Sequence, residues 1–86
     1  MRKLFLAAPL ALAVALPAVA EISVNDKIGA DEAEARAALV AAGYDVKAAE
    51  MEDGKLEFEA VKDGKEFEIY VDAMTGKVLE IELEDD

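Results

Sequence analysis

The sequence predicts an α+β domain in which one helix packs on a four-stranded antiparallel β-meander, preceded by a signal peptide. Three observations lead to this prediction. An apolar run follows a short positive start in residues 1–20, which is typical of a signal peptide. Apolar residues recur at helical spacing in 31–42, and after Gly43 they alternate with polar residues in four segments that turn signals separate.

Residues 1–20 have the three-part pattern of a secretory signal. Arg2 and Lys3 supply the positive start, an apolar stretch covers 4–18, and small residues precede a cleavage position after Ala20. The alternative, an uncleaved membrane anchor, needs about 20 predominantly apolar residues. This run is shorter and contains two prolines. We therefore expect cleavage after Ala20, and the style of the signal indicates the periplasm of a Gram-negative bacterium.

Cleavage would leave residues 21–86, which suffice for one domain. Because Arg2 and Lys3 leave with the signal, the formal net charge falls from −11 to −13. Such a surface repels nucleic acid and anionic membranes, and it favours basic partners or cations, or simply solubility. The chain has no cysteine, which excludes disulfides and lipid attachment to a cysteine. A core of this size rarely supplies more than about 3–5 kcal/mol of stability.

Residues 21–30 are predicted to form an extended leading segment that offers the core Ile22, Val24 and Ile28. A helix over 31–42 follows, because Asp31 and Glu34 form the D-x-x-E version of a capping box. Gly43 is suited to the left-handed position that ends a helix. The helix presents one small apolar face, made of Ala35, Ala38, Leu39 and Ala42.

Four segments after Gly43 alternate apolar and polar side chains, as half-buried strands do. Asp-Gly pairs at 53–54 and 63–64 separate the first three and are strong hairpin signals. The predicted strands cover residues 44–51, 55–62, 65–72 and 77–83.

The strand register follows from keeping the apolar residues on one face. A two-residue loop at 63–64 pairs Ala60 with Phe67, Phe58 with Ile69 and Leu56 with Val71. The same loop at 53–54 would turn the first strand's apolar residues outward, so a three-residue loop at 52–54 is predicted there. That loop sets Ala48 opposite Phe58 and Val46 opposite Ala60. The predicted core then contains Leu39, Val46, Leu56, Phe58, Phe67, Ile69, Val71, Leu79 and Ile81.

The run from Gly43 to Glu82 resembles the PepSY domain family. The likeness includes the Gly43-Tyr44 helix exit, the E-x-x-D-G first turn and the element D-x-x-T-G-x-V at residues 72–78. It covers roughly residues 28–83. Members of this family occur in propeptides of secreted thermolysin-like metallopeptidases, in sporulation-related proteins and as small exported proteins.

The resemblance implies a domain that restrains or modulates a peptidase. Because this chain carries no attached peptidase, the target is expected to be a separate protein, reached in trans. The family-like turn residues are Asp72, Thr75 and Gly76. Their residue types have a sufficient structural role, since Asp and Thr accept backbone hydrogen bonds and Gly permits a positive φ. A structural turn is therefore favoured over a functional loop.

Catalysis is disfavoured by residues that the chain lacks. It has no histidine and no cysteine, and its only serine and threonine are Ser23 and Thr75. A nucleophile–base arrangement or a zinc site cannot be assembled from this set. Paired carboxylates could act as acid and base, but they require a shaped, partly dry cleft. The prediction is a non-catalytic protein with no cofactor and no metal.

The outward face of the sheet is predicted to be strongly acidic. The register brings together Glu57, Glu59, Glu68, Tyr70, Glu80 and Glu82. Like charges that face one another across strands are destabilising, so this set is either a solvated face, which we favour, or a docking surface. The free edges of the first and last strands are a second route to binding, although the acidic end from Glu82 onward also guards against aggregation.

Two hypotheses follow. The first is an exported PepSY-type binding or modulator protein that acts by surface contact, with a peptidase as its implied partner. The alternative is an acidic cation-binding or stress- and stability-related periplasmic protein without a dedicated protein target. The oligomeric state does not follow from the sequence.

Overall fold

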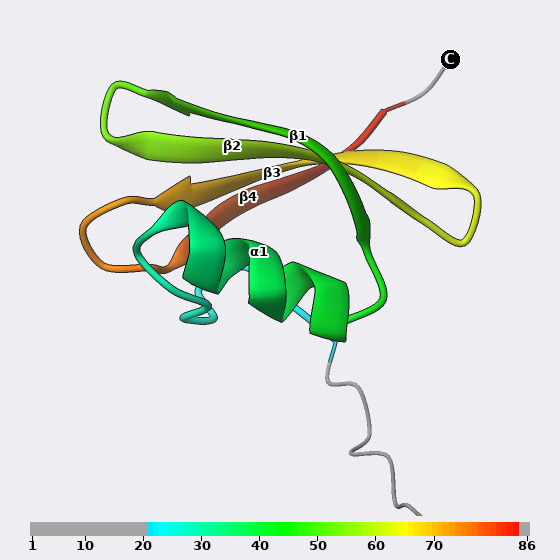
Figure 1. Cartoon of the computed structure of the whole chain (residues 1–86), viewed down its shortest axis with the longest axis horizontal. Coiled ribbons are helices and arrows are strands. Elements are labelled where there is room, and N and C mark those ends of the chain that lie inside the picture. The colour runs from blue at the N-terminus through cyan, green and yellow to red at the C-terminus, as the bar shows by residue number, and fades with distance from the viewer. Residues whose placement is uncertain (1–20, 85–86) are drawn as a thin grey trace, which may run out of the picture.

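The computed structural model describes residues 21–84, so the predicted signal peptide over 1–20 and the last two residues lie outside the described part. The chain forms α1 (Glu32–Ala41) and then β1 (Asp45–Glu52), β2 (Lys55–Lys62), β3 (Lys65–Asp72) and β4 (Val78–Glu84). The strands form one antiparallel sheet in the order β1-β2-β3-β4. Figure 1 shows α1 against one side of this sheet. The predicted fold class is confirmed.

Both ends of α1 are capped as the sequence predicts. Asp31 accepts a hydrogen bond from the Glu34 backbone N–H at 2.9 Å, which satisfies one free donor of the first turn. At the other end, Gly43 adopts a φ of 97°. The N–H groups of Gly43 and Tyr44 donate to the carbonyls of Val40 at 3.0 Å and Leu39 at 2.9 Å. This is the Schellman pattern, which ends a helix at a left-handed glycine.

Within residues 21–84, α1 is not long and apolar enough to cross a membrane. It buries the predicted small face instead: Ala35, Leu39 and Ala42 are buried. These alanines let the helix axis approach the sheet closely, so Leu39 reaches the inner face of the sheet. The core consists of Ala35, Leu39, Ala42, Tyr44, Leu56, Phe58, Ala60, Ile69, Val71 and Val78.

The β1–β2 hairpin differs from the prediction. Glu52 pairs with Lys55, so the loop has two residues, as at 63–64, and the predicted three-residue loop is wrong. Asp53 and Asp63 have nearly the same φ, 50° and 54°, as type I′ turns require. Val46 still pairs with Ala60 because a bulge between Val46 and Ala48 inserts one residue.

That bulge also changes which alanine faces the core. Ala49, not Ala48, lies opposite Phe58, and Ala48 lies opposite Glu59 on the outer face. The predicted pairing of Ala48 with Phe58 is therefore wrong. The register of β2 with β3, in contrast, is as predicted at Ala60–Phe67, Phe58–Ile69 and Leu56–Val71.

A second bulge corrects the predicted core in β4. Val71 pairs with Val78 and Tyr70 with Glu80, so Leu79 is the inserted residue. Leu79 is 43% exposed and Val78 is fully buried, the reverse of what strict alternation predicts. Val46, Phe67 and Ile81 pack against the core but are only partly buried.

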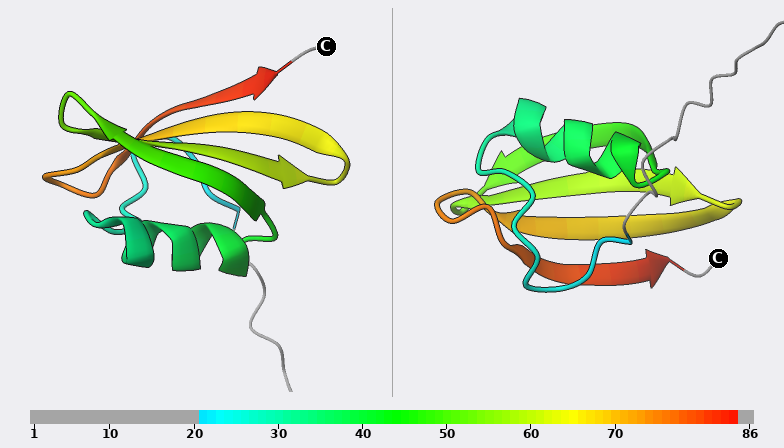
Figure 2. Two further views of the ribbon diagram at one scale, coloured as in Figure 1. Left: turned by 45° about the horizontal axis from the view of Figure 1, so that its top comes forward. Right: turned by 90° about the horizontal axis from the view of Figure 1, so that it is seen from below.

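The leading segment is held against the turn between β3 and β4. Ile28 donates to the Gly76 carbonyl at 2.8 Å, and Asp26 accepts from Val78 at 2.8 Å. Figure 2 shows the segment passing beside the start of β4 before it reaches α1. Ile22 and Ile28 pack against the core as predicted, whereas Val24 is 47% exposed.

Gly76 lies directly against the backbone of the leading segment. A Cβ added to Gly76 would lie 2.9 Å from the carbonyl carbon of Gly29. Its φ is 79°. We expect Gly76→Ala to lower the free energy of unfolding by about 2–4 kcal/mol, from the left-handed backbone and the overpacking together. Chemical denaturation measures this loss.

Gly64→Ala is the matched control. Gly64 has a similar φ of 77°, but a Cβ there would meet nothing within 4 Å. Only the backbone contribution remains, about 1–2 kcal/mol. Equal losses in the two variants would show that the contact with Gly29 does not hold the leading segment in place.

Candidate functional site: the acidic face of the sheet

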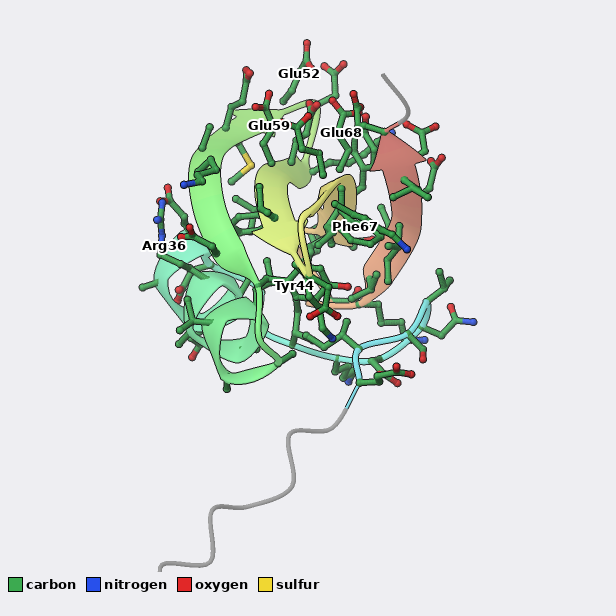
Figure 3. All side chains as sticks on the ribbon, turned by 90° about the vertical axis from the view of Figure 1, so that its right-hand side faces the viewer. Arg36, Tyr44, Glu52, Glu59, Phe67 and Glu68 are labelled. Carbon is green, nitrogen blue, oxygen red and sulfur yellow. The ribbon has the colours of Figure 1, made fainter. Side chains whose placement is uncertain are left out.

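The face of the sheet that points away from α1 carries carboxylates in successive rows. Glu59, Glu68 and Glu82 lie side by side across β2, β3 and β4, and the next row contains Glu57, Tyr70 and Glu80. Figure 3 shows Glu59 and Glu68 on this side, with α1 on the other. We call this surface the acidic face. All six predicted residues lie on it, and their role in docking stays a prediction.

The structure adds three residues to the acidic face that the sequence prediction left out. Glu50 pairs with Glu57 from β1, and Glu66 pairs with Glu84 beyond the Glu68 row. Alternation along the strands already contains this information, since residues 66, 68 and 70 must share a face. The two ion pairs among the described residues, Arg36–Glu32 and Lys47–Asp45, leave these carboxylates unneutralised.

Tyr70 lies between the carboxylates in the middle of the acidic face. Its hydroxyl donates to Glu68 Oε1 at 2.9 Å and lies 3.5 Å from Glu57 Oε2. The hydrogen bond to Glu68 raises the pKa of Tyr70 well above its usual range, and the surrounding negative charges add to the shift. Tyr70 therefore stays protonated as a donor at any physiological pH.

The carboxylates also raise the pKa values of one another. Partial burial raises the pKa of Glu57, and Glu68 and Glu50 raise it further. Repulsion from Glu80 raises the pKa of Glu82. Repulsion from Glu68 does the same for Glu84. The folded state thus concentrates negative charge that the unfolded chain would spread out.

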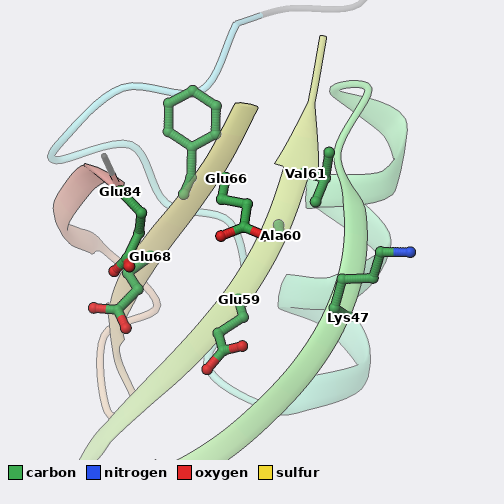
Figure 4. A pocket seen from close by; sticks show the side chains of 8 residues that line it. Lys47, Glu59, Ala60, Val61, Glu66, Glu68 and Glu84 are labelled. Carbon is green, nitrogen blue, oxygen red and sulfur yellow. The ribbon is translucent and has the colours of Figure 1, made fainter. Parts of the chain in front are cut away.

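Three carboxylates of the acidic face converge at its β3–β4 side. Single oxygens of Glu68, Glu82 and Glu84 lie within 4.8 Å of one another. In Figure 4 the side chains of Glu68 and Glu84 lie next to each other, while the amino group of Lys47 points away. The hollow at this end measures about 120 Å³ and is lined by Lys47, Glu59, Ala60, Val61, Glu66, Phe67, Glu68 and Glu84.

The family-like turn residues begin at Asp72, the last residue of β3, and use their polar groups within the turn. Asp72 Oδ1 accepts from the backbone N–H groups of Met74 at 2.8 Å and Thr75 at 3.3 Å. Thr75 Oγ1 accepts from Lys77 at 3.2 Å. Gly76 donates to the Asp72 carbonyl at 2.8 Å. These contacts account for each residue type as turn chemistry.

Among residues 21–84 no charged side chain is buried. The carboxylates therefore share an open surface and not a dry cleft in which one carboxyl could act as acid and another as base. The chemistry that this arrangement supports is attraction of positive charge, through several carboxylates at once.

Comparison with known proteins gives one match. The model of a family described as peptidase propeptide and YPEB domain matches residues 4–82, nearly the whole chain. No curated protein and no solved structure matches. PepSY domains of this kind are propeptide-like, are generally non-catalytic and occur typically in exported proteins.

We expect the melting temperature to rise as the pH falls from 7 towards 5. A raised carboxyl pKa means that the folded state binds the proton more tightly than the unfolded chain, whose glutamates titrate near 4.5. The stabilisation is complete below that value and is lost as the pH rises through the folded-state pKa. Thermal unfolding followed by circular dichroism at several pH values measures the effect.

The triple variant Glu57→Gln, Glu82→Gln, Glu84→Gln removes the three carboxyl groups whose pKa is raised. It should melt at a higher temperature than the natural protein at pH 7 and respond less to pH between 7 and 5. A variant that melts lower at pH 7 would contradict net repulsion in the acidic face.

Proposed function

The chain belongs to the PepSY family of peptidase propeptide and YPEB domains, and on that premise we propose that it modulates or inhibits a peptidase in trans. The protein is exported through a signal peptide cleaved after Ala20 and works in the periplasm without catalysing a reaction. Its partner is a peptidase that carries a basic surface. The observation that carries this proposal is the acidic face.

The acidic face is suited to docking because its carboxylates stand on neighbouring, paired strands. Its carboxylates come from paired strands, so they need no rearrangement before a partner arrives. A surface of one sign attracts a partner of the other sign and raises the association rate, more strongly at low salt. The repulsion within the face also favours a basic partner, because lysine or arginine side chains would relieve it on binding.

The non-catalytic role is supported by the residue types that the chain contains. It has no histidine or cysteine, and Thr75 Oγ1 already accepts a hydrogen bond within the turn. An acidic surface that occupies a peptidase without being processed needs no reactive group of its own. Binding alone is sufficient for this role.

The test begins with the full chain expressed in a Gram-negative host. Protein recovered from the periplasm should have the mass of residues 21–86. This protein is then titrated against a thermolysin-like metallopeptidase from the same compartment, with a peptide substrate as readout. Inhibition that weakens as salt is added is the expected result.

The variant Glu59→Gln, Glu68→Gln, Glu82→Gln removes the central row of the acidic face and should weaken inhibition about tenfold or more. The matched control, Glu21→Gln, Glu32→Gln, Glu34→Gln, removes the same charge from the leading segment and α1. It should change inhibition less than about threefold, as expected of charges outside an interface. Equal effects of the two variants, or no inhibition by the natural protein, would overturn the proposal.

The alternative is a cation-binding or stress- and stability-related protein without a dedicated target. The convergence of Glu68, Glu82 and Glu84 favours calcium as the ion. Calcium takes about 6–8 oxygen ligands, so water would complete the shell and binding would be weak. The expected result is a higher melting temperature in calcium than in sodium at matched ionic strength. Equal melting temperatures would end this alternative.

A further inference from the structure

β4 is an edge strand that is only partly covered. At its start the leading segment pairs with it: Val78 donates to the Asp26 carbonyl and accepts from the Asn25 N–H, both at 2.8 Å. The segment then turns away from the edge at Asn25, whose φ is 81°, and Ile22 packs beneath the sheet against the core. Figure 2 shows the rest of β4 running on without a neighbour at its outer side.

The uncovered part of β4 presents backbone groups in a defined pattern. In an antiparallel ladder each residue directs its N–H and C=O to one side, alternately. Val78 directs both groups outward, away from β3, and beyond the bulge Ile81 and Leu83 do the same. The register of the sheet agrees. Phe67 and Ile69 direct their backbone groups to β2, so their partners Leu83 and Ile81 form no hydrogen bonds with β3 and direct theirs outward. Among residues 21–84 the outward groups of Ile81 and Leu83 have no backbone partner.

The side chains along this edge differ between the two faces of the sheet. On the outer face stand Glu80, Glu82 and Glu84, which belong to the acidic face. On the inner face stand Ile81, partly buried, and Leu83, which is 52% exposed. Any strand added here would have its own side chains alternating between these two environments, about 4.5–5.5 Å from those of β4.

The inner environment has room for an apolar side chain. A hollow of about 310 Å³ opens there. Its apolar lining residues are Ile22, Tyr44, Phe67 and Ile81, and its charged ones are Glu21, Lys62, Asp63 and Lys65. The ring of Tyr44 meets that of Phe67 edge to face, with centroids 5.6 Å apart. α1 does not extend over this end of the sheet, where the β2–β3 hairpin continues beyond the helix (Figure 1).

We propose that the free edge of β4 accepts, as a fifth strand, an extended peptide segment in which apolar and basic side chains alternate. Ile81 and Leu83 supply the backbone hydrogen bonds, the hollow beside Tyr44 and Phe67 takes an apolar side chain, and Glu80, Glu82 and Glu84 face the basic ones. The proposal rests on the function proposed above, since it specifies how a basic partner is held. It adds backbone hydrogen bonds to the electrostatic attraction by the acidic face.

The same edge disfavours a second copy of this chain. Two β4 strands paired antiparallel would bring Glu80, Glu82 and Glu84 of one copy against the same residues of the other, and like charges across a ladder are destabilising. The acidic residues therefore exclude the protein itself while they select a basic strand. This dual effect is a form of specificity through repulsion of the wrong partner.

The test uses the full chain recovered after export and a short capped peptide in which lysine and valine alternate. Amide hydrogen exchange followed by NMR should slow at Ile81 and Leu83 on binding, by about tenfold or more at saturation, because each amide gains an acceptor. A peptide of the same composition with lysines and valines in separate blocks, and one in which glutamate and valine alternate, should bind at least about tenfold more weakly.

Leu83→Pro removes one outward N–H and should weaken binding of the alternating peptide about tenfold. Met51→Pro is the matched control, because Met51 directs its N–H outward on β1, the opposite edge, and binding should be unchanged. If Leu83→Pro does not fold, Leu83→Glu tests the inner face with the backbone intact, and it should also weaken binding.

Protection of β1 amides in place of Ile81 and Leu83, equal binding of the block peptide, or a dimer paired through β4 would each overturn strand addition. These outcomes are separate from those of the peptidase assay. If the variant of the acidic face loses inhibition but no strand pairing is found, docking through the acidic face stands and strand addition is refuted. If strand pairing is found but the natural protein does not inhibit the peptidase, strand addition stands and a peptidase is refuted as the partner.

Discussion

One layer of apolar side chains between α1 and the inner face of the sheet holds this protein together. Leu39 is the large side chain that the helix contributes to the buried core, and Phe58, Ile69, Val71 and Val78 meet it from the strands. Each large apolar side chain buried in this way contributes about 1.5–3 kcal/mol. Because the layer is thin, both the outer face of the sheet and its edges are left open to the solvent, and this makes them available for function.

Alternation along the chain made most of this arrangement predictable. The helix limits followed from Asp31 and Gly43, and the β2–β3 register followed from keeping Phe58 and Ile69 on one face. Both results come from local physics, a cap or a two-residue period, that acts on every sequence in the same way. The acidic face followed for the same reason, since a residue that does not point inward must point outward.

The two bulges were not predictable in the same way. The sequence showed that one extra residue is needed between Val46 and β2 to keep the apolar side chains of the first strand inside. Either a three-residue loop or a bulge near Val46–Ala48 can accommodate that residue. The hairpin has a two-residue loop, which suits the twist of the strands, and the extra residue forms a bulge within β1. In β4 strict alternation placed Leu79 inside, whereas the bulge gives that position to Val78, whose backbone pairs with the leading segment.

The acidic face shows that this fold tolerates repulsion between like charges on neighbouring strands. Glu59, Glu68 and Glu82 stand in one row, and the raised pKa values of Glu57, Glu82 and Glu84 record the electrostatic penalty. Sequence reasoning found the row but not the convergence of Glu84 with it, because side-chain directions at the end of a strand depend on twist. A neutral surface at these positions would avoid that penalty but would not attract positive charge.

The pairing of the leading segment with β4 has a consequence for the order in which the chain can fold. Asn25 and Asp26 meet Val78, which joins regions near opposite ends of the described chain. A chain that is synthesised from its N-terminus cannot form these bonds until its last strand has been added. The domain therefore closes late, after the helix and the first three strands are already present.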